Sequence, residues 1–425
     1  MILALWLAAA WADPYRSPFP ETWTHGPSVY AGHFDRAPVP NWTVQLPGKP
    51  INAASHTERT RPVFLGDTIL IGSAGGDGLY QLDRRNGSVI REFKAAASVE
   101  SEAVVVGDRV IFADTGGHTW CYKLDGTLVW DHDSAAPVLA PPTVDDGYVF
   151  VANVDDLVVA LHAEDGSLAW RYEQPVDITR RAELALYAAP RLTRVGADLV
   201  AGFSDGTLVA FAPTTGDVHW QSRVGTGRYP DLVATPTPYR GLLFVSGYDE
   251  PLVALDLATH KSVWEAPHGA AASAVVLGDG DDATLLHPGT DGVLRAMSVL
   301  TGLERWTWDA ADDGALSMPV ITPAGILVAS SEGTVTLIDP ANGLETWGFH
   351  SSVNLDGVTS APAVDGRQLL FVTNAGFLYS MITPIGPMSA VTHVKPRKAP
   401  ELRSVMRPPT ATPSVLPVTP DPEAN

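Results

Sequence analysis

The sequence predicts an all-β fold, an eight-bladed β-propeller of four-stranded antiparallel sheets in which strands from the N- and C-terminal parts share one blade. Three observations predict it. Tryptophan recurs at a period of about 40 residues. Short apolar runs alternate with turn residues in each period. An isolated strand near the N-terminus matches a strand that the last repeat lacks.

The repeated tryptophans define the unit. They are Trp130, Trp170, Trp220, Trp264, Trp306 and Trp347. Five of them follow a glycine by four residues, namely Gly126, Gly166, Gly216, Gly302 and Gly343, whereas His260 precedes Trp264. We expect the rings to lie between neighbouring sheets and the glycines to adopt positive φ in the preceding hairpin turn. Residues repeated in every unit are expected to be structural.

The unit at 234–264 shows the expected elements in order. Apolar runs at 242–246 and 252–256 and the Trp strand at 262–265 are separated by turn residues. The units at 142–170 and 319–347 repeat this pattern, with the same distance from Pro to Trp. The first complete unit differs, because Arg91 replaces Trp, and we expect Phe93 to cover the gap from the same strand face.

The two ends of the repeat array are complementary. The last unit provides the hairpin at 369–382 and then stops without a Trp strand. Residues 41–46, which include Trp42, form a Trp strand with no unit before it. We expect these segments to complete the eighth blade, since closure removes exposed sheet edges.

The regions outside the array differ in composition. Residues 1–12 resemble a signal peptide, because residues 2–10 are apolar and Ala10-Trp11-Ala12 resembles a cleavage site; a frayed apolar terminus is the alternative. Residues 13–34 form a lead-in segment, 35–383 the propeller and 384–425 a Pro-rich tail expected to be disordered. No other stretch approaches the length of a membrane-spanning helix, so no transmembrane span is expected.

Charge and cysteine content limit the functional classes. The net charge of −20 argues against binding to nucleic acid or anionic lipid, which requires clustered Lys and Arg. Cys121 is the single cysteine, so the chain cannot form an internal disulfide. Its place in an alternating strand predicts that it packs in the core.

The stretch from Ala254 to Trp264 resembles the A-x-D-x-x-T-G-x-x-x-W motif of PQQ-type propellers, and partial copies end at Trp220 and Trp306. The resemblance covers residues 35–382 and implies either of two branches, quinoprotein dehydrogenases or non-catalytic scaffolds. The dehydrogenase branch binds PQQ with calcium through oxygen ligands. No such ligand set can be assigned here, so we expect no catalytic residue, no metal site and neither PQQ nor calcium.

The scaffold branch gives a closer match, to the BamB-type propellers of outer-membrane barrel assembly. Arg228, Asp231, Thr235 and Pro236 coincide with that family's R-L-S-D-V-D-x-T-P segment. The loop at 177–183 lies where the family has an exposed partner-binding loop, which implies a partner-binding role for Arg180 or Arg181. The alternatives are a solvated side chain or an ion pair within the chain for Arg180, Arg181 and Arg228, and a turn cap for Asp231.

The sequence therefore favours an exported, non-catalytic scaffold in the periplasm or at the periplasmic side of the outer membrane of a Gram-negative bacterium. We expect it to be a monomer that binds protein partners within a larger complex, and a partner strand docked on a blade edge is one mechanism. A PQQ-dependent oxidoreductase and a propeller that senses a ligand or carbohydrate in a central channel are the alternatives.

Overall fold

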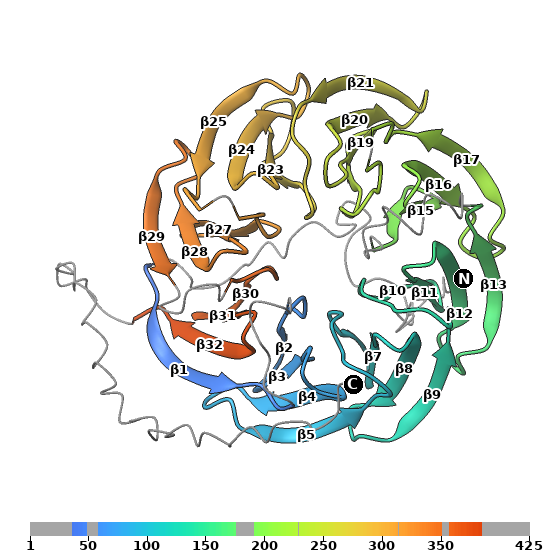
Figure 1. Cartoon of the computed structure of the whole chain (residues 1–425), viewed down its shortest axis with the longest axis vertical. Helices are drawn as coiled ribbons and strands as arrows, with labels where there is room; N and C mark the ends of the chain where they lie inside the picture. Colours follow the sequence, from blue (N-terminus) through green and yellow to red (C-terminus); the bar gives the residue numbers. More distant parts are fainter. Residues whose placement is uncertain are drawn as a thin grey trace, which may run out of the picture. The chain divides into compact units, whose positions relative to one another are not determined.

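The computed structural model describes residues 36–48, 58–175, 191–227, 229–312, 314–350 and 357–384. Within these ranges the chain forms 32 strands and no helix. The strands make eight four-stranded antiparallel sheets arranged as blades around a central axis (Figure 1). The predicted eight-bladed β-propeller is therefore confirmed. The N-terminal residues 1–35, the segment 176–190 and the tail from 385 lie outside the described residues.

Each blade runs from an inner strand near the axis to an outer strand at the periphery. Blade 1 comprises β2 (Val63–Leu65), β3 (Thr68–Ile71), β4 (Gly78–Asp83) and β5 (Val89–Lys94). Blade 2 comprises β6 (Val104–Val106), β7 (Arg109–Ala113), β8 (His118–Lys123) and β9 (Leu128–Asp133). Blade 3 comprises β10 (Thr143–Asp145), β11 (Tyr148–Ala152), β12 (Leu157–His162) and β13 (Leu168–Glu173). Blades 4 and 5 comprise β14 (Thr193–Val195), β15 (Asp198–Gly202), β16 (Thr207–Phe211) and β17 (Val218–Arg223); and β18 (Thr237–Tyr239), β19 (Leu242–Val245), β20 (Leu252–Asp256) and β21 (Lys261–Ala266).

Blades 6 to 8 complete the ring. Blade 6 comprises β22 (Val275–Leu277), β23 (Thr284–Pro288), β24 (Val293–Ser298) and β25 (Glu304–Asp309). Blade 7 comprises β26 (Val320–Thr322), β27 (Gly325–Ala329), β28 (Thr334–Ile338) and β29 (Glu345–His350). Blade 8 comprises β30 (Ala363–Asp365), β31 (Gln368–Val372), β32 (Phe377–Ile382) and β1 (Val39–Gln45). The inner strands are short, three residues each, as the narrow centre of a ring requires.

Blade 8 closes the ring with strands from both ends of the array. β1 pairs antiparallel with β32, from Val39 opposite Ile382 to Gln45 opposite Phe377. The sheet order β1-β32-β31-β30 places β1 in the outer position, where Trp strands lie in the other blades (Figure 1). The pairing expected between residues 41–46 and the 369–382 hairpin is thus present. Leu46, Trp42 and Val44 then pack against blade 1 and seal the last interface.

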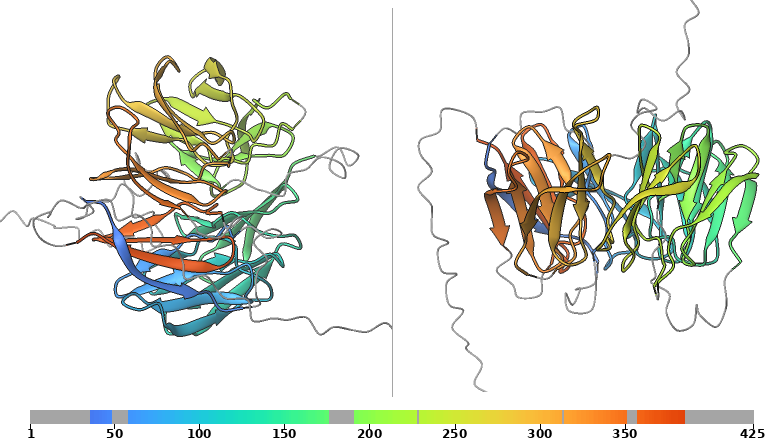
Figure 2. Two further views of the ribbon diagram at one scale, coloured as in Figure 1. Left: turned by 60° about the vertical axis from the view of Figure 1, so that its left-hand side comes forward. Right: turned by 90° about the horizontal axis from the view of Figure 1, so that it is seen from above.

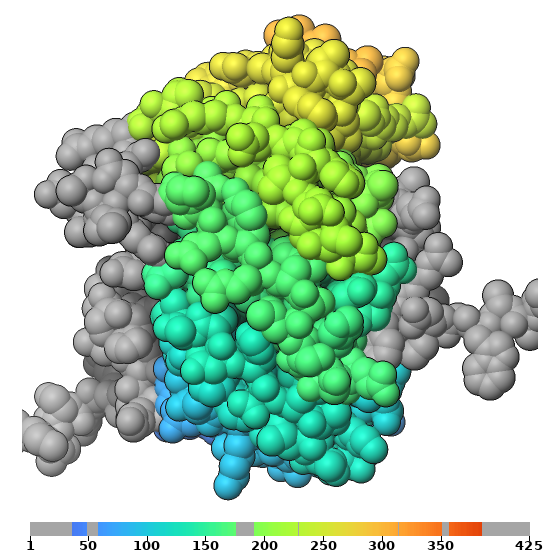
Figure 3. Space-filling model, turned by 90° about the vertical axis from the view of Figure 1, so that its right-hand side faces the viewer, coloured from blue at the N-terminus to red at the C-terminus, as the bar shows by residue number. Residues whose placement is uncertain are grey.

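The hydrophobic core is divided among the blade interfaces. The described residues form eight clusters, and each cluster joins one sheet to the next around the ring. Figure 3 looks at the outer side of the ring and shows the blades that carry β9, β13 and β17 packed side by side. Apolar residues on both faces of the middle strands are buried, because every sheet has a neighbour on each side. Cys121 is fully buried in one of these clusters, as expected.

The tryptophans join neighbouring blades through a repeated contact. The indole Nε1 of Trp42, Trp130, Trp170, Trp264 and Trp306 donates a hydrogen bond of 2.7–3.2 Å to a carbonyl oxygen in the next blade. The acceptor is always three residues before the glycine of that blade's last hairpin turn; Trp170, for example, donates to Pro213 ahead of Gly216. Each ring thus packs on the turn of the following blade.

The glycine in this turn is required for two reasons. Gly87, Gly166, Gly216, Gly302 and Gly343 adopt φ values of 68° to 75°, which residues with a side chain rarely adopt. A Cβ atom on any of them would lie only 2.6–2.8 Å from a ring atom of the preceding blade's tryptophan. The glycine four residues before a tryptophan therefore contacts the tryptophan of the previous blade. The two residues of the motif thus lie in different interfaces, because the glycine faces the previous blade and the tryptophan faces the next one.

Three of the eight interfaces depart from this pattern. Trp347 of blade 7 packs against blade 8, which has no last hairpin turn because its outer strand β1 comes from the other end of the array. His260 stands in the glycine position of blade 5, and its ring stacks on Trp220 with the centroids 4.4 Å apart. The Trp220 Nε1 accordingly donates to the Asp198 carboxylate of its own blade instead of to blade 5. In blade 1, Arg91 occupies the register position of the tryptophan, opposite Gln81, and its guanidinium faces Gly126.

Phe93 fills a different place from the one suggested by the sequence. It lies two residues beyond Arg91 and is 1% exposed. Its ring makes an edge contact with Tyr122 of blade 2, at 5.7 Å between centroids. Phe93 therefore builds the core between blades 1 and 2, while Arg91 itself covers the docking glycine.

We predict that Gly216→Ala destabilises the protein more than Gly196→Ala. Both glycines have positive φ, but only the Gly216 methyl group would clash, at 2.6 Å from Trp170, whereas nothing lies within 4 Å of a Cβ at Gly196. Backbone strain should reduce the free energy of unfolding by about 1–2 kcal/mol in both variants, and the clash should remove about 1–3 kcal/mol more from Gly216→Ala. Urea unfolding followed by tryptophan fluorescence measures the difference, and equal losses would contradict the docking role of Gly216.

Candidate protein-binding face

The chain path gives the propeller two different faces. One face, called here the linker face, carries the connections from each outer strand to the next inner strand and the turns between second and third strands. The opposite hairpin face carries the remaining two turns of each blade. In the edge-on view the coloured strands run between the two faces, and their turns lie on both sides of the ring (Figure 2). Of the partner-binding residues predicted from the sequence, Asp231 lies on the linker face, in the connection between blades 4 and 5, whereas Arg180, Arg181 and Arg228 lie outside the described residues.

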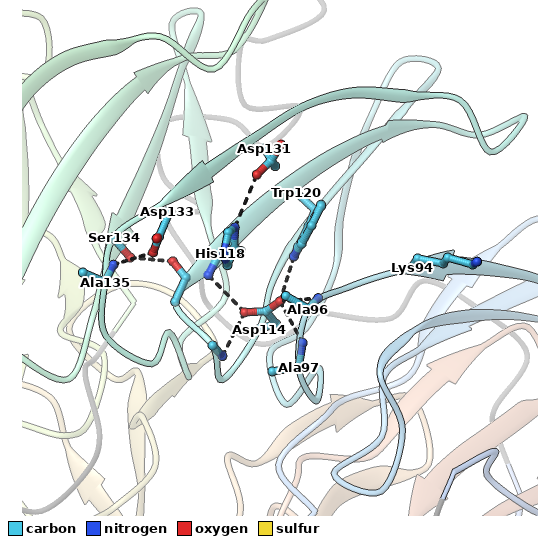
Figure 4. Close-up of polar contacts among 12 residues, drawn as sticks. Lys94, Ala96, Ala97, Asp114, His118, Trp120, Asp131, Asp133, Ser134 and Ala135 are labelled. Atoms are coloured by element: carbon cyan, nitrogen blue, oxygen red, sulfur yellow. Dashed lines mark hydrogen bonds and ion pairs between the residues drawn. The ribbon is translucent and has the colours of Figure 1, made fainter.

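Buried acidic residues hold the connections of the linker face in place. Asp114, in the turn between β7 and β8, is fully buried and accepts hydrogen bonds from the backbone N–H groups of Ala96 and Ala97 at 3.0 and 3.3 Å. The same carboxylate accepts the indole N–H of Trp120 at 2.9 Å (Figure 4). One side chain therefore fixes the connection that arrives from the previous blade. Charge-assisted bonds of this kind are among the stronger ones in proteins.

Glu250 does the same for the connection between blades 4 and 5. Its side chain is 3% exposed, and its two oxygens accept the backbone N–H groups of Thr226 and Gly227 at 3.1 and 2.6 Å. These residues immediately precede Arg228, which lies outside the described residues. The chain on the N-terminal side of Arg228 is thus held rigidly by the adjacent blade.

Asp231 lies within the same connection and is buried. Asp231 as a whole is 3% exposed. Its backbone carbonyl oxygen lies so close to Gly247 that a Cβ atom added to Gly247 would be only 2.5 Å from it. Leu232, the next residue, donates its N–H to the carbonyl of Phe203 at 3.3 Å. A side chain with so little exposed area offers little to a partner, which favours a role in shaping the connection over direct binding.

The other two predicted residues, Arg180 and Arg181, lie in the segment 176–190 outside the described residues. The chain on either side of this segment belongs to blades 3 and 4. Gln174 on one side donates to Asp205 of blade 4 at 3.0 Å, and Arg191 on the other donates its backbone N–H to Thr235 of blade 5 at 3.2 Å. This connection and the one with Arg228 and Asp231 are therefore consecutive around the ring.

Sequence reasoning did not single out Asp114 or Glu250. The available signal was a polar residue in or beside the second turn of each repeat, such as Asp114, Asn153, Asp205 and Glu250. Such residues are also typical of exposed turns, so the sequence could not distinguish buried anchors from solvated caps. Asp114 and Glu250 are anchors because backbone N–H groups of the neighbouring connection bond to their carboxylates, and the sequence alone does not show this contact.

Glu58 is a further buried acid on this face. It is fully buried, both carboxyl oxygens accept the Ala74 N–H at 3.0 and 3.2 Å, and its own N–H donates to the Asn374 side chain at 3.0 Å. Burial raises the pKa of the Glu58 carboxyl to about 8, and the nearby Glu100 adds to the increase. Glu58 therefore links the connection after β1 to blades 1 and 8.

Calcium beside a quinone is bound by clustered oxygen ligands. The described residues contain no group of three or more His, Cys, Asp or Glu side chains placed to hold a metal ion. Cys121 is buried within blade 2, and burial raises the pKa of its thiol to about 11, so it is not a reactive thiolate at neutral pH. In the same ranges no helix is both long and apolar enough to cross a membrane.

Tryptophan docking between four-stranded blades and closure by an N-terminal strand define an eight-bladed propeller of PQQ-like repeats. Comparison with known proteins identifies the family. A family model described as "Outer membrane protein assembly factor BamB" matches residues 78–285 and 236–386. The chain belongs to this family.

Individual relatives agree with this assignment at low identity. The outer membrane protein assembly factor BamB of Burkholderia pseudomallei is 24% identical over 329 residues, which cover 75% of this chain and 82% of the relative. The crystal structure of BamB from Moraxella catarrhalis superposes with a TM-score of 0.65 at 17% identity, covering 80% of this chain and all of that one. Quinohemoprotein alcohol dehydrogenase from Comamonas testosteroni shares the fold, with a TM-score of 0.63 at 12% identity over 85% of this chain and 80% of its own.

We predict that Glu58→Gln flattens the pH dependence of stability. The folded carboxyl titrates near pH 8 and the unfolded one near 4.5, so the folded state holds a proton that the unfolded state has released. Stability from this group is complete below pH 4.5 and is lost as pH rises through 8, by at most about 1.4 kcal/mol per pH unit. Glutamine cannot ionise, and its amide oxygen can still accept the Ala74 N–H.

Urea unfolding at pH 5, 6.5 and 8 measures the effect. The variant should be more stable than the wild type at pH 8 and show the smaller loss between pH 5 and 8. Glu265→Gln, which changes an exposed carboxylate on β21, is the matched control and should keep the wild-type slope. A Glu58→Gln slope equal to that of the wild type would show that Glu58 does not retain its proton in the folded protein.

Proposed function

We propose that this protein is a non-catalytic scaffold of the Gram-negative cell envelope that binds other proteins during outer-membrane protein assembly. Membership of the BamB family supports the process, because the relatives are named outer membrane protein assembly factors. The proposed location is the periplasm or the periplasmic side of the outer membrane. The protein would act as a monomer within a larger complex, without PQQ, calcium or another cofactor.

The rigid anchoring of the linker face is the structural observation that carries the proposal. Glu250 fixes the backbone immediately before Arg228 through two hydrogen bonds, and Leu232 beyond it donates its N–H to Phe203 of blade 4. A binding loop on a rigid support loses less conformational entropy when a partner docks. We infer that Arg180 and Arg181, in the preceding connection, and Arg228 meet carboxylates of the partner, since Arg can pair with them bidentately.

The test is capture of partners from a detergent-solubilised outer-membrane fraction by the full chain. We expect wild-type protein to capture the integral outer-membrane assembly protein, and Arg180→Glu with Arg181→Glu to reduce its recovery at least about 10-fold, as loss of two charged pairs predicts. Arg85→Glu with Lys261→Glu makes the same charge change at exposed positions of the hairpin face and should capture normally.

The outcomes separate the function from the site. If wild-type protein captures no outer-membrane assembly component, the scaffold function is wrong. If capture occurs but both double variants behave like the wild type, the assignment of Arg180 and Arg181 is wrong while the function stands. Quantitative mass spectrometry of the captured material distinguishes these results.

A PQQ-dependent oxidoreductase is the second candidate, favoured by the shared fold of the quinohemoprotein alcohol dehydrogenase. At 12% identity this likeness concerns the fold alone. Addition of PQQ with Ca²⁺ to the purified protein tests the candidate directly. We expect neither a bound-quinone absorption spectrum nor reduction of an electron-accepting dye in the presence of alcohols, and both signals together would overturn the scaffold proposal.

A further inference from the structure

Three charged residues occupy equivalent positions at the inner edge of the linker face. Arg61, Glu102 and Arg191 each precede the first residue of an inner strand by two positions, in blades 1, 2 and 4. The corresponding residues of the other blades are uncharged: Pro141, Thr235, Ser273, Met318 and Ala361. Since the inner strands converge around the axis (Figure 1), this repeat position brings the three charges toward one another.

The two arginines make the same contact in their respective blades. Arg191 Nη2 donates to the carbonyl oxygen of Pro142 in blade 3 at 3.3 Å, and Arg61 Nη2 donates to that of Pro362 in blade 8 at 3.3 Å. Pro142 and Pro362 each stand immediately before an inner strand. Arg61 Nη1 also lies 3.8 Å from Glu102 Oε1. The preceding blade thus fixes each guanidinium at the inner edge.

The three described residues at this repeat position carry more positive than negative charge. Arg61 and Arg191 are positive and Glu102 is negative, in a chain whose net charge is −20. Burial lowers the pKa of Arg191, the positive charge of Arg61 adds to this, and Glu102 offsets part of it. The Nε atom of Arg191 is also buried, with no hydrogen-bond partner among the described residues. A buried donor without an acceptor is unfavourable.

We propose that Arg191, supported by the charge of Arg61, forms an oxyanion-binding site at the inner edge of the linker face. Its ligand is a small carboxylate or phosphate. A guanidinium presents donors in a planar fork that matches both groups, and an anion placed there would satisfy the Nε donor and balance the excess charge. The position near the axis, inside a ring of inner strands, favours a small anion over the surface of a folded protein.

The site is independent of the proposed scaffold function. It lies on the linker face but uses none of the arginines assigned to protein binding. It also differs from a metal-dependent cofactor site, because its donors are guanidinium groups and its single carboxylate is paired with Arg61. Binding of the anion would join blades 1 and 4 electrostatically and stabilise the folded ring.

Isothermal titration calorimetry of the full chain with citrate, and separately with inorganic phosphate, tests the site at pH 7 and low ionic strength. We expect saturable binding of one anion per chain and an increase in Tm with anion concentration. Arg191→Gln should weaken binding at least about 10-fold, because it removes a charged donor. Glu102→Gln should strengthen binding at least about 3-fold, because it removes the competing carboxylate.

Arg171→Gln is the matched control, since Arg171 lies exposed on β13 beside Glu173 and should bind as the wild type does. Near-ultraviolet circular dichroism verifies that each variant folds. The opposite effects expected for Arg191→Gln and Glu102→Gln keep the inference testable even if one variant unfolds. Absence of saturable binding by the wild type, or affinity unchanged by Glu102→Gln, would overturn the inference, as would equal losses in Arg191→Gln and Arg171→Gln.

Discussion

The structure depends on the packing of one blade's tryptophan against the last hairpin turn of the next blade. The ring covers the turn glycine, and the indole N–H is satisfied by a carbonyl of that turn. Each sheet buries its apolar residues only through its neighbours, so this contact sets the spacing at which the eight interfacial clusters form. Where the glycine is missing, His260 keeps the ring in place by stacking and the hydrogen bond moves to Asp198.

The same construction explains why the linker face can carry function. The blades need their strands and docking turns for stability, whereas the connections between blades are free to vary as long as an anchor fixes their course. Asp114 and Glu250 are such anchors, because each accepts two backbone N–H groups from the connection before its own blade. The backbone of a binding residue beside such an anchor is held in place by the ring, although the residue itself is not part of the hydrophobic core.

The fold was largely predictable because its signals repeat. The Trp period, the apolar runs and the unmatched strand around Trp42 predicted eight blades and their closure, and all are present. The glycine four residues before a tryptophan was predictable as a turn residue, but its partner in the preceding blade was not, because the sequence does not show which interface a residue faces. The site was harder to predict. Asp231, Glu250 and the Nε atom of Arg191 are buried by chain segments that are distant in the sequence, and local sequence patterns do not show which segments these are.

Closure by β1 has a consequence for the order of folding. β1 precedes every other described strand, yet its partner β32 is the last of them, about 330 residues later. During synthesis the earliest strand therefore remains unpaired until the final hairpin emerges, and the first blade lacks its neighbour for just as long. Contacts between residues so far apart in the sequence form slowly. Until they form, unpaired strand edges stay exposed and are prone to aggregation.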